Sequence, residues 1–237
     1  MSFVSLPSRL LAIAALVPRG SLVADIGTDH ALLPIYLIEN GITDRVIASD
    51  IVDGPLSSAK KNISAHGLED EISIIKSDGI AKVYPFTPKT IIIAGMGGET
   101  IRDIISACDY SVSGAPYFIL QPMTRPELLR EYLIKNGFSI LSETVIQEQH
   151  HFYVIISAQY KQEQEHYFKR YDISESLIYE LGGITPQSSS AAVNYLLWRK
   201  ETALRAREGL LKSQSSAERA EEFSALVCEI DRRLSIK

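Results

Sequence analysis

The sequence predicts an α/β protein in which helices wrap a mostly parallel sheet and a helical segment follows. Three observations support this prediction. Between residues 22 and 160, short runs rich in β-branched residues alternate with amphipathic stretches of helix length. The last two of these runs are joined by only a short polar turn. Beyond residue 160 the strand patterns stop, and two long helical patterns take their place.

Seven segments have the length and composition of strands. In chain order they are Leu22–Ile26, Arg45–Ser49, Ile72–Lys76, Thr90–Ala94, Tyr117–Leu120, Phe138–Ile146 and Phe152–Ala158. Helix-compatible stretches connect the first five. Five such strands followed by a hairpin are typical of the class I, Rossmann-like methyltransferases, whose last strand inserts antiparallel, whereas a dinucleotide-binding domain more often adds another βα unit. The strand order therefore favours methyl transfer over hydride transfer.

The two helical patterns predict a coiled-coil-like hairpin. The first spans Ser188–Lys212 and the second Ser216–Leu234, with a turn between them at residues 212–215. Apolar residues recur at helical spacing in both. The expected buried stripes consist of Val193, Leu197, Leu204 and Leu211 in the first helix, and Ala220, Phe223, Val227, Ile230 and Leu234 in the second.

Composition excludes several classes of protein. The chain has 237 residues, of which 46% are hydrophobic and 22% charged, and this excludes a mostly disordered chain. The apolar run Leu10–Val17 is too short to cross a bilayer and is read as a helix. The only cysteines, Cys108 and Cys228, lack the spacing of a disulfide framework or a zinc site. We therefore expect a cytoplasmic protein with no membrane contact and no metal.

The loop after the first strand is expected to bind a ligand. Residues 23–34 form an apolar strand that ends in Asp25 and Gly27 and turns into a helix, and such a turn lets backbone approach a ligand closely. The usual methyltransferase loop has three alternate glycines, but here Asp29 and an alanine stand at the second and third positions. A plain strand-to-helix turn is the alternative. His30 within the loop fits either a substrate contact or a helix cap.

Two further carboxylates follow neighbouring strands. Asp50 ends the second strand, about 20 to 25 residues beyond the first loop, where a carboxylate can accept both ribose hydroxyl hydrogens of an adenosyl group. Asp78, followed by Gly79, comes after the third strand and is placed to accept a hydrogen bond from an adenine amine. Capping of the next helix is the alternative for Asp50, and Asp53 could equally take that role.

The fourth strand ends in the glycine-rich string Gly95-Met96-Gly97-Gly98, at the sheet edge where open α/β folds bind ligands. Its glycines would leave room for a flat base. Amino-group methyltransferases often carry Asn or Asp followed by Pro-Pro and an aromatic residue here, and that motif is absent. The string also lacks the GxxxxGK[ST] pattern of nucleotide hydrolases. Gln121 leaves the apolar fifth strand at the same edge, as a pocket residue or as a solvated loop amide.

With these strings in this order, the chain closely resembles the bacterial tRNA (adenine(22)-N1)-methyltransferase family, essentially end to end. The most specific strings are Asp25-Ile-Gly-Thr-Asp-His and Gly95-Met-Gly-Gly, and Ser8-Arg9-Leu10 matches the family's opening helix. The resemblance implies S-adenosylmethionine as cofactor and N1 of adenine 22, in the D-arm region of tRNA, as methyl acceptor. One departure is Leu32, where members of the family carry a tyrosine near the cofactor.

Two overlapping sets of site residues follow from the motifs and the resemblance. The cofactor set comprises Asp25, Gly27, Thr28, Asp29, Asp50, Ile51, Asp78, Gly79 and Gly95. The reaction set comprises Asp29, His30, Gly95, Met96, Gly97 and Gln121. Because methylation of N1 leaves the adenine ring cationic, a nearby carboxylate such as Asp29 should favour the developing charge.

We divide the chain into a catalytic domain at residues 1–160 and a helical, tRNA-contacting domain at residues 161–237. N1 lies on the Watson–Crick edge, so the base must be exposed or flipped out, and this requires a grip on the surrounding RNA. The expected phosphate contacts are Arg9, Arg199, Lys200, Arg205, Arg207 and Lys212. A solvated charged face with i,i+4 pairs is the alternative. A methyltransferase for another RNA, a protein or a small molecule, and a noncatalytic protein whose hairpin binds a partner, also stay open.

Overall fold

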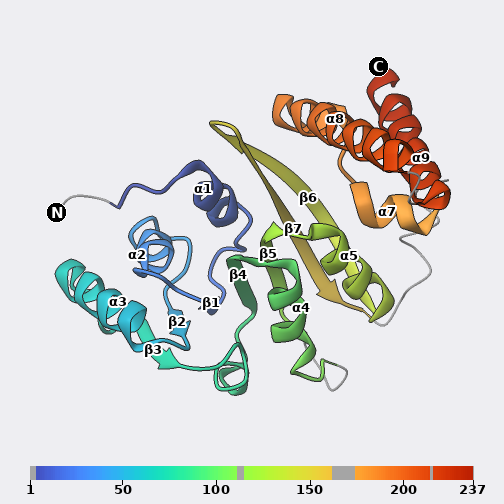
Figure 1. The fold of residues 1–237 in the computed structure, drawn as a ribbon. Helices are drawn as coiled ribbons and strands as arrows, with labels where there is room; N and C mark the ends of the chain where they lie inside the picture. The colour runs from blue at the N-terminus through green and yellow to red at the C-terminus, as the bar shows by residue number, and fades with distance from the viewer. Residues whose placement is uncertain (1–3, 111–114, 162–173, 214–215, 237) are drawn as a thin grey trace.

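A computed structural model describes residues 4–110, 115–161, 174–213 and 216–236 of the chain. These residues form one seven-stranded sheet with helices on both faces and a helical hairpin at one end (Figure 1). The strands are β1 (Val23–Ile26), β2 (Val46–Asp50), β3 (Ile72–Lys76), β4 (Thr90–Gly97), β5 (Tyr117–Thr124), β6 (Phe138–Glu148) and β7 (His151–Tyr160). The helices are α1 (Ser8–Ala15), α2 (Leu32–Glu39), α3 (Asp53–His66), α4 (Gly98–Ser106), α5 (Pro126–Lys135), α7 (Glu175–Leu181), α8 (Ser190–Ser213) and α9 (Ala217–Ser235), with two 3-10 turns, η1 (Tyr84–Phe86) and η2 (Pro186–Ser188).

The sheet has the strand order β3-β2-β1-β4-β5-β7-β6. The first five strands are parallel, and β7 lies antiparallel between β5 and β6. This arrangement confirms the predicted class I, Rossmann-like fold and its closing hairpin. β4 and β5 each run at least three residues further than predicted, to Gly97 and Thr124, because the two continue to pair past an irregularity at Gly95. The hairpin strands β6 and β7 are also longer than predicted, by two and three residues.

Alternate residues of the central strands enter two separate cores, one on each face of the sheet. Ile91 and Ile93 of β4 point into the core that is covered by α4, α5 and the C-terminal helices. Ile92 between them points into the core that is covered by α1, α2 and α3. This two-residue alternation is the geometry of a strand buried on both faces. Because β2, β1 and β4 are neighbours and parallel, their carboxyl ends lie side by side at one edge of the sheet.

The C-terminal helices share the core of the sheet. Ile178 of α7, Leu196 of α8 and Ile230 of α9 are fully buried, in the same hydrophobic cluster as Phe118 and Ile156 of the sheet. The long β6–β7 hairpin rises beyond the other strands, and β6 packs against both α1 and α8 (Figure 1). Helix α7 was not predicted. The middle of the predicted turn, residues 214–215, and the segment 162–173 lie outside the described residues.

The predicted buried stripe of α8 is wrong at three of its four positions, since only Val193 is partly buried. Leu197, Leu204 and Leu211 are exposed. The residues that are buried instead are Ala192, Tyr195, Leu196 and Ala203. Small alanines let the neighbouring elements approach the helix closely, so the buried face follows Ala192 and Ala203 and not the leucine heptad. The stripe predicted for α9 is confirmed, with Ala220 and Ile230 buried and Phe223, Val227 and Leu234 partly buried.

A buried polar cluster fastens the C-terminal helices to the sheet. Arg130 of α5 and Glu143 of β6 form an ion pair, with 2.7 Å between Nε and Oε1, and both side chains are almost completely buried. Arg130 Nη1 also donates to the carbonyl oxygen of Tyr179 at 2.9 Å, and Glu143 accepts the Gly183 N–H. From the other side, Arg233 of α9 donates to the carbonyl oxygen of Gly182 at 2.9 Å. The Gly182–Gly183 turn is therefore held by side chains of α5 and β6 on one side and of α9 on the other.

Candidate functional site

A cavity of about 480 Å³ lies at the carboxyl ends of β1, β2 and β4, beside α1. Three carboxylates and one arginine face it. The residues that line it are Pro7, Arg9, Leu10, Asp25, Gly27, Thr28, Asp29, His30, Leu32, Leu33, Asp50, Ala94 and Gly95. The structure thus brings together the ends of three strands and the N-terminal helix. This is the sheet edge at which open α/β folds bind ligands.

Gly27 anchors the loop after β1. Its φ of +77° is a left-handed conformation, and a Cβ atom here would lie 2.1 Å from Met96 Cε. The N–H groups of Gly27 and Thr28 both donate to the carbonyl oxygen of Ser49 at 2.8 Å, which ties the loop to β2. A side chain at Gly27 would therefore displace Met96 and strain the turn. The close approach that the sequence suggested is made here by Met96.

Asp25 is the most perturbed carboxyl group in the cavity. Burial raises its pKa to about 6, against the opposing effect of the Thr28 hydroxyl, and the Asp50 carboxylate raises the pKa further. The group is only 7% exposed. A cation placed beside Asp25 and Asp50 would offset the cost of burying the Asp25 charge and the repulsion between the two carboxylates. The inner part of the cavity therefore favours a positively charged ligand.

Asp50 ends β2 at the cavity wall. Its Oδ1 accepts the N–H of Val52 at 2.8 Å, and the residue at the N-cap position of α3 is Val52, without a side-chain cap. Asp50 therefore holds its own loop and not the first turn of α3, while Asp53 pairs with Lys76 at 2.7 Å. Ile51 beside it is 54% exposed, an unusual exposure for isoleucine.

Asp78 and Gly79 do not line the cavity. They follow β3, the edge strand next to β2, and the N–H of Ser77 donates to the carbonyl oxygen of Asp50 at 3.0 Å. Asp78 is exposed, and Gly79 packs against Ile104 of α4. Their predicted contact with an adenine ring thus stays a prediction, although the loop lies directly beside Asp50.

Gln121 and Gly95 meet at the end of the paired strands β4 and β5. Gln121 is fully buried, so it is not a solvated loop amide. Its Oε1 accepts the Gly95 N–H at 3.2 Å and Arg9 Nη1 at 3.1 Å. Its Nε2 donates to the carbonyl oxygen of Pro122 at 3.1 Å and contacts Met123 Sδ at 3.4 Å. The amide is therefore satisfied on both sides, and Gln121 supports the cavity wall at Gly95.

The other members of the glycine-rich string pack the strands together. A Cβ atom on Gly98 would lie 2.3 Å from the Arg125 carbonyl oxygen, and one on Gly97 would lie 3.2 Å from Thr124 Oγ1. Gly95, in contrast, has a φ of +80° and open space at its Cβ position. Only Gly95 of the three glycines borders the cavity. Open space is thus found at Gly95, whereas Gly97 and Gly98 allow β4 and β5 to approach, and the predicted room for a flat base stays a prediction for Gly95 alone.

Asp29 and His30 stand at the mouth of the cavity. The side chains are 79% and 50% exposed, and His30 Nε2 lies 3.4 Å from Asp29 Oδ1. The carbonyl oxygen of His30 accepts Asn62 Nδ2 at 2.9 Å, which links the loop to α3. Both side chains are free to meet a substrate that enters from solvent.

Comparisons with known proteins agree with this arrangement. A family model described as a methyltransferase domain matches residues 6–156. The tRNA (adenine(22)-N(1))-methyltransferase of Bacillus subtilis strain 168 is 35% identical over 159 residues, which are 67% of each chain. The chain belongs to the tRNA (adenine(22)-N1)-methyltransferase family. This confirms the resemblance inferred from the sequence motifs.

Solved structures of the family extend the match to the whole chain. The crystal structure of the B. subtilis m1A22 tRNA methyltransferase has a TM-score of 0.84 and 26% identity, and the match covers 98% of this chain and 100% of that one. An M. capricolum relative, solved with the cofactor product S-adenosylhomocysteine, has a TM-score of 0.78 and 27% identity, with 96% and 99% covered. The helical hairpin is therefore part of the common fold of this methyltransferase family.

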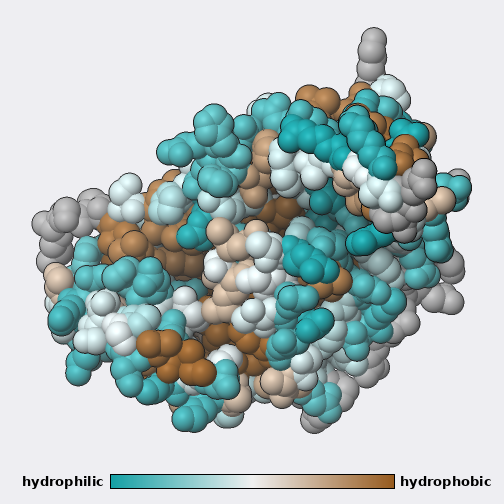
Figure 2. All heavy atoms as spheres, viewed as in Figure 1, coloured by the Kyte–Doolittle hydropathy of each residue, from teal (hydrophilic) through white to brown (hydrophobic). Residues whose placement is uncertain are grey.

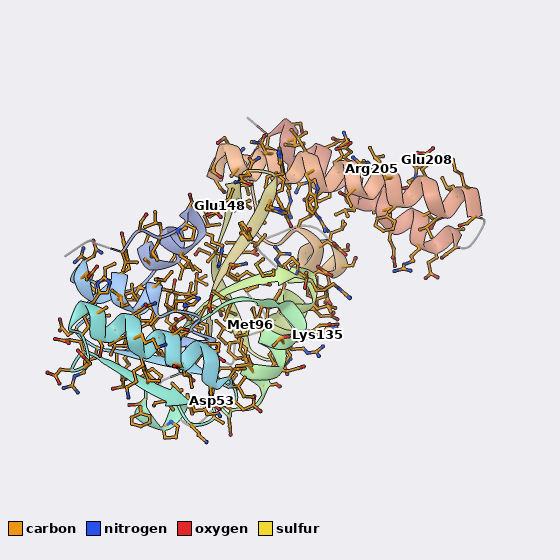
Figure 3. The ribbon with its side chains drawn as sticks, turned by 60° about the vertical axis from the view of Figure 1, so that its left-hand side comes forward. Asp53, Met96, Lys135, Glu148, Arg205 and Glu208 are labelled. Carbon is orange, nitrogen blue, oxygen red and sulfur yellow. The ribbon has the colours of Figure 1, made fainter. Side chains whose placement is uncertain are left out.

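In this methyltransferase the predicted phosphate contacts fall in two places. Arg9 lines the cavity, and the others lie along α8, where most of them pair with carboxylates. The pairs are Arg199 with Glu180, Lys200 with Asp231 at 2.5 Å, Arg205 with Glu201, and Lys212 with Glu208 at 2.7 Å, while Arg207 is exposed. Arg205 and Glu208 lie on a part of α8 that is far from Met96 of β4 (Figure 3). Most side chains on this part of the surface are hydrophilic, with separate hydrophobic ones among them (Figure 2).

Sequence reasoning missed several residues of the methyltransferase cavity. The missed residues are Pro7, Leu10, Leu33 and Ala94, whereas Leu32, which the family resemblance had singled out, also lines the cavity and is 36% exposed. These apolar residues carry no motif of their own, and only their neighbours in the sequence point to them. Among the described residues, no helix is long and apolar enough to span a membrane, and no three metal-ligating side chains gather at one point.

Proposed function

We propose that this chain transfers the methyl group of S-adenosylmethionine to N1 of adenine 22 in tRNA. The observation that supports this most is the cavity in which Asp25 and Asp50, at the ends of β1 and β2, face Gly95 at the end of β4. The membership of the chain in the tRNA (adenine(22)-N1)-methyltransferase family supports the choice of acceptor.

The residues of the cavity fit an adenosyl sulfonium. Asp50 would accept the ribose hydroxyl hydrogens, and the exposed side chain of Ile51 would cover the adenine ring. Asp25, whose pKa burial raises to about 6, would gain from a positively charged neighbour. The open space at Gly95 would admit the acceptor base beside the methyl group.

The residues of the chain have three tasks in this reaction. Bound S-adenosylmethionine would supply a methyl group on a positively charged sulfur. Adenine N1 donates its lone pair to that methyl carbon as the carbon–sulfur bond breaks, so the positive charge passes to the ring and no proton is released in the step. The cavity wall at Gly95 aligns the base, α1 and Leu32 restrict the access of water, and the Asp29 carboxylate stabilises the cationic ring.

The direct test is the transfer of labelled methyl from S-adenosylmethionine to unmodified tRNA, followed by nucleoside mass spectrometry. We expect 1-methyladenosine in tRNA with adenine at position 22 and none when that adenine is replaced by guanine. Asp50→Ala should weaken binding of the cofactor on the order of 10-fold or more, because alanine cannot accept the ribose hydroxyl hydrogens. Cofactor binding without label in tRNA would support methylation of another acceptor, and the absence of both would support a noncatalytic role.

The role of Asp29 gives a second test. Asp29→Asn keeps the shape of the side chain and removes its charge, so we expect the fold to persist and kcat to fall on the order of 10- to 100-fold. The measurement is the turnover rate at saturating tRNA and cofactor, with the melting temperature as control. Unchanged turnover would exclude Asp29 from charge stabilisation.

The cellular location and the division of the chain into domains follow from this proposed function. We infer a cytoplasmic location, since tRNA modification and the two unpaired cysteines fit a reducing compartment. We also retain residues 1–160 as the catalytic domain and residues 161–237 as the part that contacts tRNA. The cations along α8 support the second assignment, because their exposed pairs are weak enough for phosphates to compete with the carboxylates.

A further inference from the structure

Arg9 fastens the N-terminal helix to three strands at the rim of the cavity. Its backbone N–H donates to Glu148 Oε1 at the end of β6, with 2.7 Å between the two atoms. Its Nη1 donates to Gln121 Oε1 of β5 at 3.1 Å, and its guanidinium carbon lies 5.8 Å from the centre of the Tyr153 ring of β7. Glu148 stands beside α1 in the side-chain view (Figure 3). One residue thus links α1 to the sheet at the point where the cavity opens.

The partner of Arg9, Gln121, occupies a special position in the β4–β5 pair. Ala94 pairs with Gln121 and Met96 pairs with Pro122, so Gly95 is left out of the register as an extra residue. Such a bulge leaves a backbone group in need of another partner. The Gly95 N–H finds it in Gln121 Oε1 at 3.2 Å. The buried amide of Gln121 therefore holds the bulge that forms the open wall of the cavity.

Arg9 and Gly95 together fix the orientation of this amide. Two donors, Arg9 Nη1 and the Gly95 N–H, face the same side of Gln121, and each requires an oxygen there. The reversed amide would set its own NH₂ group against both. Without Arg9, Gln121 Oε1 would keep only the Gly95 N–H as a donor, and the amide would be held on its other side by the bond from Nε2 to the Pro122 carbonyl oxygen and the contact with Met123 Sδ.

We propose that Arg9 is a positioning residue for methyl transfer, which acts through Gln121 to hold the Gly95 bulge in the conformation that receives the acceptor base. The identity of that base rests on the proposed function. The hydrogen-bonded chain from Arg9 to Gly95 does not depend on it. A role for Arg9 as a simple phosphate contact makes different predictions, because such a contact would affect tRNA affinity and not the state of Gly95.

The first test needs neither cofactor nor tRNA. Amide hydrogen exchange of ¹⁵N-glycine-labelled protein reports directly on the Gly95 N–H. We expect Arg9→Met and Gln121→Met each to raise its exchange rate on the order of 10-fold or more, because the hydrogen bond opens more often in the first variant and is removed in the second. The matched control is Arg45→Met, at an exposed arginine directly before β2, which should leave Gly95 unchanged. Unaltered Gly95 exchange in Arg9→Met would overturn the proposal.

The second test separates positioning from RNA binding. We expect Arg9→Met to lower kcat on the order of 10- to 100-fold, since a small displacement of reacting groups is costly, with the KM for tRNA changed much less. The effects of Arg9→Met and Gln121→Met should be strongly non-additive in the double variant, because both act on the same amide. A raised KM with unchanged kcat would assign Arg9 to a phosphate contact and refute positioning. Arg9 is only partly buried and its variant should fold, so it decides the question even if Gln121→Met does not fold.

Discussion

Asp25 is a carboxyl group held where little water reaches it, so its charge depends on pH near neutrality. Because burial raises its pKa to about 6, the folded chain binds this proton more tightly than the unfolded chain does. The resulting stabilisation is present in full below the ordinary pKa of an aspartic acid. It is lost as the pH rises through about 6.

Asp25→Asn removes this dependence. Relative to wild type, the free energy of unfolding of the variant should rise by on the order of 2 to 3 kcal/mol between pH 4 and pH 8. Urea unfolding of both proteins at the two pH values provides the measurement. An equal difference between the two proteins at both pH values would show that the charge of Asp25 is not what burial penalises.

Helix α8 shows most clearly that a hydrophobic residue need not be buried. Leu196 is fully buried, whereas Leu197 is 49% exposed. Leu196→Ala should therefore lower the free energy of unfolding by about 2 to 5 kcal/mol, and Leu197→Ala should change it by no more than about 0.5 kcal/mol. The neighbouring residues have the same side chain and helix, so each is the control for the other. Similar losses of unfolding free energy in both variants would show that the face of α8 with Leu197, Leu204 and Leu211 is buried as well.

The turn between α7 and η2 is a second element that can be tested. Gly182 has a φ of +56°, and a Cβ atom there would lie 2.0 Å from Glu143 Oε2 and 2.6 Å from Arg130 Nε. Gly182→Ala should therefore destabilise the protein by several kcal/mol, on the order of a broken buried ion pair. Gly209→Ala is the matched control, because Gly209 lies within α8 with open space at its Cβ position and alanine favours helix there by about 1 kcal/mol. The measurement is the denaturation midpoint of each variant, and an equal change of midpoint in Gly182→Ala and Gly209→Ala would contradict this interpretation.

The elements also show which features the sequence alone can predict. All seven strands were found, because short runs rich in β-branched residues between turns and stretches of helix length are a local signal. Asp25, Asp50 and Gly95 were placed together because parallel strands end at the same edge of a sheet. The extension of β4 and β5 depends on pairing between distant segments, and the buried face of α8 depends on what packs against it. Arg9 meets Gln121 across 112 residues of chain, and no motif near either residue indicates that contact.

For the whole molecule, the charges along α8 are the feature that bears on tRNA. Arg205 and Lys212 form exposed i,i+4 pairs, and Arg207 is exposed beside them. Replacing all three by alanine should raise the KM for tRNA and make the salt dependence of binding shallower, by about one unit for each phosphate that the variant no longer neutralises. Glu201→Ala with Glu208→Ala, which frees two of the cations, should leave or lower the KM. An unchanged KM and salt slope in the triple variant would identify a solvated face.

Point variants suit this question better than truncation. Leu196 and Ile230 belong to the same hydrophobic cluster as Phe118 and Ile156, so loss of residues 161–237 would uncover the core of the sheet. Lost activity in such a fragment would then report on folding as well as on tRNA binding. The variants of α8 alter exposed charges only and leave that core intact.

The hydrogen bonds that hold the Gly182–Gly183 turn from two sides limit which segments of this enzyme can be exchanged with those of its relatives in a chimera. Arg130 and Glu143 hold the turn from the sheet, and Arg233 holds it from α9. A chimera that exchanges only residues 161–237 would keep the Arg130–Glu143 ion pair but remove its backbone partners at Tyr179 and Gly183, so buried polar groups would lose their hydrogen bonds. A functional exchange must therefore transfer Arg130 and Glu143 together with the turn, as one inherited block whose two halves lie on opposite sides of the proposed domain boundary.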